Sequence, residues 1–247
     1  MKMIYVIAEG RTECNFVKSA LAGHFHQYNV SLIPITIPTG KSPSGGTAKG
    51  GWRRTDGYAY ALRNIQRIIK TNNYAAHTTF FDYYAFPIDI PCREEAALMD
   101  NPLDKAALYE KQLYEDVVHS FDGDRDFRPA SFIPFLQPYE FEAFLFVDPC
   151  TCAKELAVGD ADEALRIEKA MSAVSAQFDT PEHINEGFDT APSKRIAGID
   201  SGFIKNKAGK AGFSWRIANK IGIERIREKC LHFDKWMSDL EDYATSL

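Results

Sequence analysis

Acidic residues stand at the ends of two runs of apolar and β-branched residues that are typical of buried strands. Glu9 follows the run Met3–Ala8 and precedes Gly10, and Asp82 ends the sequence HTTFFD. In an open parallel sheet, functional groups collect in the crevice beyond the carboxyl ends of the strands. If the two strands are neighbours, about 4.8 Å apart, both carboxylates can bind one hard cation, because Mg²⁺ keeps several waters and needs few protein oxygens. The pattern therefore predicts a Mg²⁺ or Mn²⁺ site at Glu9 and Asp82.

A third carboxylate is expected from the segment FIPFLQPYEFEAFLF, which places Glu140 and Glu142 just beyond another apolar run. Residues two apart on a helix point in different directions, so we expect only one of them in the site and favour Glu140. A glutamate at a helix start is also favoured by the macrodipole without any function. Gly10 fits this interpretation, because glycine lets the chain turn sharply and lets a phosphate or metal-bound water approach the backbone.

Strand and helix patterns alternate through the first half of the chain. The predicted strands are Met3–Ala8, Val30–Ile37, Thr78–Asp82 and Phe132–Leu136, and the predicted helices are Glu13–Tyr28, about Gly57–Lys70 and about Lys105–Phe121. Strands separated by helices predict an α/β fold, with a mostly parallel sheet and helices on both of its faces.

After about Asp148 only helical patterns remain, so we expect an α/β domain over residues 1–148 and a helical extension over residues 149–247. Large apolar residues of the extension, such as Trp215 and Trp236, predict that it packs on another surface of the protein.

The composition is that of a globular protein, with 45% hydrophobic and 26% charged residues. No stretch approaches the roughly 20 apolar residues of a membrane helix, and no basic region precedes an apolar signal core. The five cysteines are scattered without a CxxC pair, which favours reduced thiols. We therefore expect a cytoplasmic protein with no membrane partner.

The charges are unevenly distributed. Between Pro38 and Lys70 seven Lys and Arg face one acid, and between Ser193 and Lys235 eleven face four, whereas Asp82 to Glu142 holds fourteen acids and five bases. Basic segments that flank an acidic one suit a site that gathers phosphates around a carboxylate-held metal, although each segment can also be a solvated helix face. The candidate nucleic-acid contacts are Lys41, Lys49, Arg53, Arg54, Lys194, Arg195, Lys205 and Lys207. Lys41 and Lys49 lie in the Gly-, Ser- and Lys-rich segment PTGKSPSGGTAKGGW, predicted to be a loop, and Arg53 and Arg54 directly follow it; the segment lacks the GxxxxGK[ST] pattern of ATP-binding P-loops.

The segments EGRTE, FDYYAFPID, IPFLQPYEFEAFLF, PEHINEGFDTAPSKRI and KCLHFDKWMSDLE together resemble the Toprim-like bacterial proteins of domain-of-unknown-function family 4276. The resemblance covers nearly the whole chain and implies a Toprim-like, Rossmann-like sheet, related in fold to the overcoming-lysogenization-defect nucleases. Toprim domains hold Mg²⁺ with a glutamate after the first strand and a later Asp-x-Asp. The resemblance thus implies that Glu9 is the Toprim glutamate and Asp82 the first aspartate.

One position departs from that pattern, because Tyr84 stands where the second aspartate would fall. A tyrosine cannot replace a carboxylate as a Mg²⁺ ligand at neutral pH. Asp89 or Glu140 could supply the missing charge.

These features favour a Mg²⁺-dependent nuclease or related phosphodiester-transfer protein in which Glu9, Asp82 and Glu140 are catalytic. The resemblance implies a phage-defence role beside a partner ATPase. A Toprim-shaped binding subunit that has lost catalysis is the alternative, and a small-molecule phosphatase shares the metal chemistry. Oligomeric state and the choice of DNA or RNA stay open.

Overall fold

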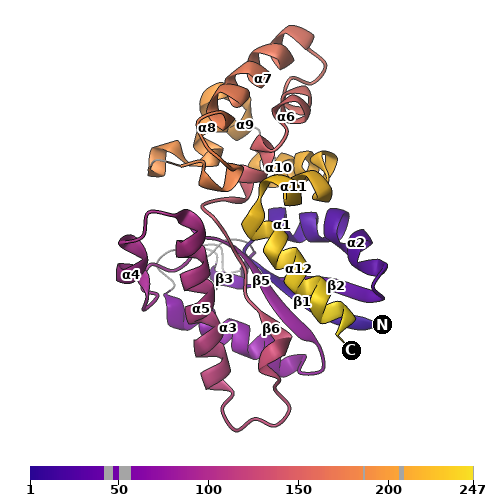
Figure 1. The fold of residues 1–247 in the computed structure, drawn as a ribbon, viewed down its shortest axis with the longest axis vertical. Helices are drawn as coiled ribbons and strands as arrows, with labels where there is room; N and C mark the ends of the chain where they lie inside the picture. The colour runs from indigo at the N-terminus through magenta and orange to yellow at the C-terminus, as the bar shows by residue number, and fades with distance from the viewer. Residues whose placement is uncertain (42–46, 50–56, 186, 206–208, 247) are drawn as a thin grey trace.

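A parallel sheet lies at the centre of the computed structural model, which describes residues 1–41, 47–49, 57–185, 187–205 and 209–246 (Figure 1). The strand order is β2-β1-β5-β6, with β7 also beside β5, and all of these pairings are parallel. The strands are β1 (Lys2–Ala8), β2 (Val30–Thr36), β5 (Ala76–Asp82), β6 (Phe132–Ile133) and β7 (Leu136–Gln137). The predicted sheet is confirmed, including the direct pairing of the strands that precede Glu9 and end at Asp82.

The last predicted strand, Phe132–Leu136, is divided into β6 and β7. Pro134 stands in the break and has no N–H to donate to a neighbouring strand. Thr79 of β5 bridges the break, because its Oγ1 donates to the carbonyl of Phe135 (2.8 Å) and accepts from the Phe135 N–H (2.8 Å).

Two hydrophobic cores cover the two faces of the sheet. Alternation along β5 sends Phe80 into one core and Phe81 into the other. The Phe80 core contains side chains from α1 (Arg11–Phe16), its π-helical continuation η1 (Val17–Leu21), α2 (Ala22–His26), α10 (Gly209–Ile221) and α12 (Leu231–Thr245). The Phe81 core contains side chains from α3 (Tyr58–Thr71), α4 (Arg93–Ala97) and α5 (Pro102–Ser120). The prediction of helices on both faces is therefore confirmed.

The helical second half begins after the 3₁₀ segment η3 (Phe141–Phe146). In Figure 1, α6 to α8 lie beyond one end of the sheet, while α12 runs back alongside the strands. Besides α10, the described elements between η3 and α12 are α6 (Pro149–Leu156), α7 (Ala161–Ser175), 3₁₀ segments η4 (Pro181–His183) and η5 (Phe188–Thr190), α8 (Pro192–Ile199), α9 (Gly202–Lys205) and α11 (Ile223–Lys229). Ile217, Ile226 and Phe233 share one core with Ile4 and Phe80, so this half packs directly on the sheet. The boundary at residue 148 remains a prediction.

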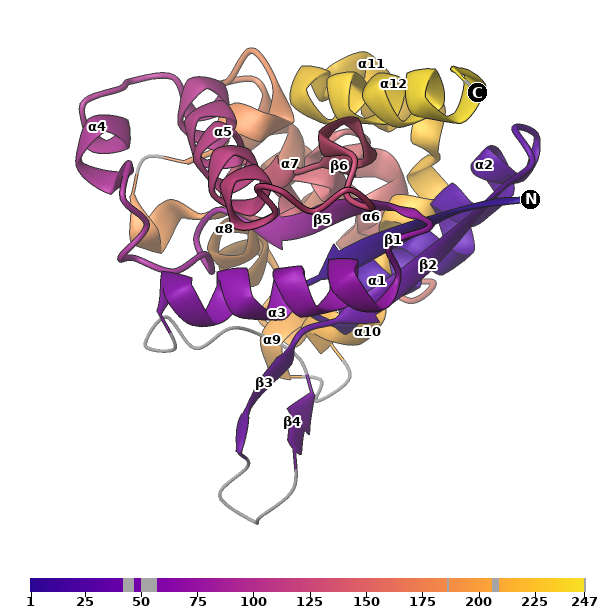
Figure 2. The ribbon, with the colours of Figure 1, turned by 90° about the horizontal axis from the view of Figure 1, so that it is seen from below.

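A hairpin occupies part of the segment predicted to be a loop. β3 (Pro38–Lys41) and β4 (Thr47–Lys49) pair antiparallel and project away from the sheet (Figure 2). Strand pairing gives the backbone N–H and C=O groups partners that an open loop would leave to water. The glycine and serine content of the segment concealed this hairpin in the sequence.

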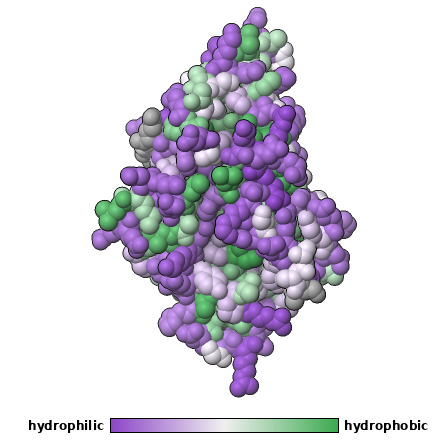
Figure 3. Space-filling model, viewed as in Figure 1, coloured by the Kyte–Doolittle hydropathy of each residue, from purple (hydrophilic) through white to green (hydrophobic). Residues whose placement is uncertain are grey.

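The surface in the view of Figure 1 is mostly hydrophilic, with hydrophobic residues in small scattered groups (Figure 3). Among the described helices, none combines the length and apolar character required to cross a bilayer.

Trp236 of α12 contacts the sheet directly, so its substitution tests how α12 packs there. Its indole Nε1 donates to Thr78 Oγ1 (2.8 Å), and its ring stacks on Phe135 with centroids 4.4 Å apart. Because the side chain is only 3% exposed, we expect Trp236→Ala to lower the free energy of unfolding by about 3–5 kcal/mol. Urea denaturation measures this loss. The half-buried Trp215 is the control, and an equal or larger effect of Trp215→Ala would contradict this account.

Candidate functional site

The pairing of β1 with β5 brings the two predicted strand-end carboxylates to the same edge of the sheet. Ala8 lies opposite Phe80, and the N–H of Glu9 donates to the carbonyl of Phe80 (3.3 Å). Asp82 follows two residues later. Burial raises the pKa of Asp82 well above its usual value, and the charges of Glu9, Glu13, Glu142 and Glu140, in decreasing order, raise it further. Five carboxyl groups from three chain segments therefore share this edge of the sheet. They are called the acidic group below and belong to Glu9, Glu13, Asp82, Glu140 and Glu142.

Several of these carboxylates also hold neighbouring elements in place. Asp82 Oδ1 accepts from the N–H of Phe141 (2.8 Å). Glu140 Oε2 accepts from the N–H of Ser193 (2.8 Å) at the start of α8. Glu142 Oε1 accepts from the hydroxyl of Ser214 (3.0 Å) in α10. The acidic group therefore positions the helices that border it.

Glu13 belongs to this group although the sequence reasoning missed it as a site residue. Its carboxylate is buried and accepts from the N–H of Gly10 (2.9 Å), which caps α1. The sequence signal was the pair of glutamates in EGRTE, where the second one stands three residues after Gly10. Capping explained that spacing without a site.

The reason for Gly10 differs from the expected sharp turn. Gly10 is extended, with φ −144° and ψ −166°, which other residues also adopt. A Cβ at this position would lie 3.2 Å from Glu13 Oε2. Glycine therefore leaves room for the Glu13 carboxylate.

The charges of Glu140 and Glu142 both raise the pKa of Asp82, whereas only one of the two was expected in the site; which of them enters it stays a prediction. Glu140 has extended backbone angles just before η3, and Glu142 lies within that short 3₁₀ segment. The rule for residues two apart on an α-helix therefore does not apply to this pair. Glu142 is the more buried of the two and has the stronger influence on the pKa of Asp82.

The turn between β7 and η3 is strained at Tyr139. Its φ of 59° lies in the left-handed region, which is uncommon for a bulky residue. The hydrogen bond from Phe141 to Asp82 closes this turn over the end of β5. Strained backbone of this kind collects at functional sites.

Asp89 lies apart from the acidic group, whereas Tyr84 lies near one of its members, Glu140. Asp89 is exposed, and its Oδ1 accepts from the N–H of Tyr58 (2.7 Å) at the start of α3. It is not among the charges that raise the pKa of Asp82. Tyr84 is half-buried, and its hydroxyl hydrogen-bonds with Asn185. Burial raises the pKa of Tyr84, and the nearby charge of Glu140 contributes to that rise.

The oxygen atoms of the acidic group suit a hard divalent cation, but their arrangement does not give a complete set of protein ligands. Every polar atom of the acidic group is an oxygen, as Mg²⁺ and Mn²⁺ prefer. Within the described part of the chain, however, no three His, Cys, Asp or Glu side chains form a group that could hold a metal ion. Mg²⁺ commonly binds through one or two carboxylates, several waters and substrate phosphates. Asp82 and Glu9 are the two carboxylates that would hold such a partly hydrated cation, and its binding stays a prediction.

The predicted nucleic-acid contacts are described only in part. Lys194 is exposed and follows Ser193, whose N–H binds Glu140. Arg195 Nε donates to the carbonyl of Thr190 (2.9 Å), and its guanidinium lies 5.3 Å from the centre of the Phe178 ring. The backbones of Lys41 and Lys49 belong to the β3–β4 hairpin, and that of Lys205 ends α9. Those three side chains, and all of Arg53, Arg54 and Lys207, lie outside the described part.

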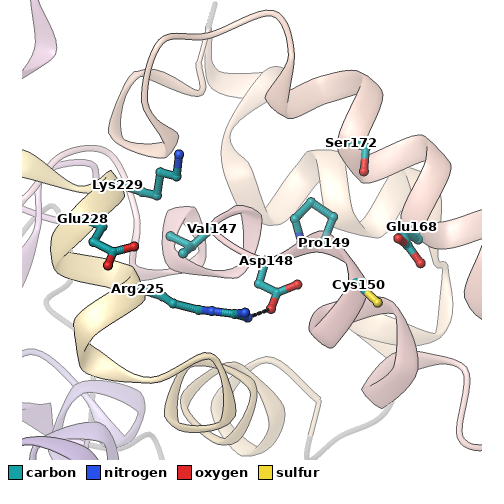
Figure 4. Close-up of a pocket in the computed structure, with 9 residues that line it drawn as sticks. All are labelled: Val147, Asp148, Pro149, Cys150, Glu168, Ser172, Arg225, Glu228 and Lys229. Atoms are coloured by element: carbon teal, nitrogen blue, oxygen red, sulfur yellow. Dashed lines mark hydrogen bonds and ion pairs between the residues drawn. The ribbon is translucent and has the colours of Figure 1, made fainter.

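A separate hollow of about 330 Å³ lies between α6, α7 and α11. Asp148 and Arg225 form an ion pair across it (Figure 4). Its lining includes Glu168 and Lys229 but none of the five carboxylates around Asp82. This hollow is therefore distinct from the acidic group.

The fold and the site define an α/β protein with a carboxylate-rich edge at the ends of its parallel strands. The chain belongs to the family described as Domain of unknown function (DUF4276), whose family model matches residues 8–241. Searches of curated proteins and of solved structures found no significant match. Membership of this family, which the sequence resemblance indicated, is thus confirmed, while the Toprim-like relationship remains a prediction.

Neutralising Asp82 should stabilise the metal-free protein near pH 7. Its folded-state pKa lies well above the usual value of an aspartate, so the stability contributed by protonated Asp82 is full below that usual value and is lost as the pH rises through the folded pKa. Asp82→Asn keeps an oxygen for the Phe141 N–H and removes the repulsion. We expect a gain on the order of 1 kcal/mol, or about 2–4 °C in Tm, and a flatter pH profile. Thermal unfolding in chelator between pH 4 and pH 8 measures both.

Asp148 provides a control of opposite sign. Burial alone would raise its pKa, but hydrogen bonds from Thr151 and the charge of Arg225 lower it overall. The stability contributed by Asp148 is therefore present above its unfolded pKa and is lost as the pH falls, so Asp148→Asn should destabilise the protein at pH 7. Destabilisation of both variants at pH 7 would contradict the repulsion inferred at Asp82.

Proposed function

We propose that this protein cleaves phosphodiester bonds in nucleic acid with the help of Mg²⁺ or Mn²⁺, through a Toprim-like arrangement of acids. The observation that carries the proposal is the position of Asp82. It lies at the carboxyl end of β5, beside the strand that leads into Glu9, and four other carboxylates raise its pKa. Desolvated like charges oppose each other, and a bound cation would relieve that opposition.

In this proposal the side chains have separate tasks. Asp82 and Glu9 hold the cation, while Glu13, Glu140 and Glu142 add negative charge and fix the surrounding backbone. A bound divalent cation stabilises charge on the phosphate and lowers the pKa of an attacking water. Glu9 also serves as general acid or base. Lys194 follows Ser193, whose N–H donates to Glu140, and contacts the phosphate backbone.

The biological setting follows from the Toprim resemblance and belongs to the same proposal. We place the protein in the cytoplasm, in a phage-defence system, where a partner ATPase switches cleavage on. An activity that depends on such a partner can be missing from the isolated chain, so metal binding is the primary readout.

A catalytically inactive, Toprim-shaped binding subunit is the second candidate. Tyr84 at the position of the second aspartate favours it, as does the finding that, among the described residues, no three His, Cys, Asp or Glu side chains form a group that could hold a metal ion. The two candidates differ in their need for metal. A nuclease requires a divalent cation at Asp82 and Glu9, whereas a binding subunit retains its nucleic-acid affinity without one.

Asp82→Asn and Glu9→Gln should each weaken Mn²⁺ binding at least about tenfold and abolish metal-dependent cleavage. Isothermal titration with MnCl₂ measures the binding, and a labelled single- or double-stranded oligonucleotide, with and without Mg²⁺, reports cleavage. Asp89→Asn is the matched control, because this acid lies at the start of α3 and is not among the charges on Asp82. Mn²⁺ binding that is unchanged in the Glu9→Gln, Asp82→Asn double variant would refute the metal site.

Tyr84→Asp tests whether the tyrosine weakens the site. The new carboxylate would stand near Glu140, whose charge already raises the pKa of Tyr84. We expect Mn²⁺ affinity to rise about tenfold, because hard cations bind more tightly to sites with more carboxylates. Tyr84→Asn is the control, since it loses the same ring contact with Tyr139 without adding charge. Equal Mn²⁺ affinities of the two variants would show that position 84 does not limit cation binding.

A further inference from the structure

Gln137 is a fully buried amide for which the described structure provides no hydrogen-bond partner. Its side chain is 0% exposed, and neither Oε1 nor Nε2 has a hydrogen-bond partner among the described residues. Buried polar groups are otherwise nearly always hydrogen-bonded, since leaving one unpaired is unfavourable. The amide of Gln137 therefore lacks, among the described residues, the partner that its burial calls for, and a bound ion, ligand oxygen or water would supply it.

The strand register places Gln137 beside Asp82. The two residues lie opposite each other in the parallel β5–β7 pair. The preceding pair, Phe81 and Leu136, faces the core formed with α3 and α5. Successive side chains of a strand point to opposite faces, so Asp82 and Gln137 both point to the other face. The backbone of Gln137 is fixed there, because its carbonyl accepts from the N–H of Tyr83 (3.0 Å).

The surroundings on that face are those of the acidic group. Glu13 reaches it from α1 and Glu142 from η3, and both act on Asp82. A carboxamide differs from these neighbours, because it carries no charge and presents one acceptor oxygen and two N–H donors. It can contact a cation and an anionic oxygen at once without adding to the local repulsion.

We propose that Gln137 is a further contact residue of this site, where Oε1 faces a hydrated divalent cation beside Asp82 and Nε2 donates to a phosphate oxygen held by that cation. This inference rests on the proposed function and adds a neutral residue to its acidic ligands. Gln137 would place a phosphate relative to the cation, whereas Asp82 and Glu9 supply the charge that binds it.

His77 is the matched control for the loss of a buried, unpartnered polar group. It lies on the same strand as Asp82, five residues earlier, is 1% exposed, and neither ring nitrogen has a hydrogen-bond partner within the described part of the chain. Its ring stacks on Tyr5 with centroids 5.6 Å apart. His77→Phe removes the polar atoms at the opposite end of β5 from the acidic group.

The test compares Gln137→Met, Gln137→Glu and His77→Phe with the unmodified chain by calorimetric titration with MnCl₂ and by thermal unfolding in chelator. Gln137→Met has a similar volume and no amide, so we expect Mn²⁺ affinity to fall about tenfold while metal-free stability is kept or raised. Gln137→Glu retains an oxygen and adds a charge, so we expect it to bind Mn²⁺ at least as tightly as the unmodified chain and to be less stable without metal. His77→Phe should bind Mn²⁺ with unchanged affinity.

The outcomes separate this inference from the proposed function. If Gln137→Met binds Mn²⁺ as the unmodified chain does, while Asp82→Asn does not, the amide is satisfied by ordered water only and the inference is overturned, but the metal site stands. If the unmodified chain does not bind Mn²⁺, both fail. If His77→Phe weakens binding as much as Gln137→Met, the effect reflects general packing and the inference is also overturned.

Discussion

The parallel pairing of β1 with β5 places carboxylates where water cannot fully solvate them, and much of the structure around the site follows from that constraint. Charges of like sign that are withdrawn from water repel each other and need donors. The N–H of Phe141, the N–H of Ser193 and the hydroxyl of Ser214 are such donors. These donors come from η3, α8 and α10. The elements that enclose the site therefore also provide the hydrogen bonds that stabilise its carboxylates.

The aromatic core stabilises the fold, whereas the strained turn and the desolvated carboxylates of the site are locally unfavourable. Phe80, Phe135 and Trp236 pack edge to face or stacked, with centroids within 5.3 Å, directly below the ends of the strands. Such a rigid aromatic layer can hold a strained turn at Tyr139 and a desolvated Asp82 that would be unfavourable alone. Proteins often accept local instability at functional sites when the surrounding core is strong.

Much of the fold could be predicted because apolar, β-branched runs such as Met3–Ala8 are buried in almost any α/β sheet. The same runs predicted that Glu9 and Asp82 stand at strand ends, but their proximity depended on the two strands being neighbours, which the pairing of β1 with β5 shows. Glu13 and Gln137 could not be recognised in this way, since capping explains the first and a polar strand end explains the second. Their significance depends on which strands pair and which face each residue takes. The β3–β4 hairpin was concealed because glycine and serine are typical of loops as well as of turns between short strands.

The break in the third strand has a further consequence. β6 and β7 keep the same offset to β5 on either side of Pro134, since Thr78 pairs with Ile133 and Phe81 pairs with Leu136. Thr79 bridges the interruption without inserting or omitting a residue. A strand has a period of two, so one residue added or removed here would turn Gln137 away from Asp82 towards the other core. Family members should therefore vary in side chain between Phe132 and Gln137 more readily than in length, and an alignment gap in this stretch would mark a chain whose strand end is built differently.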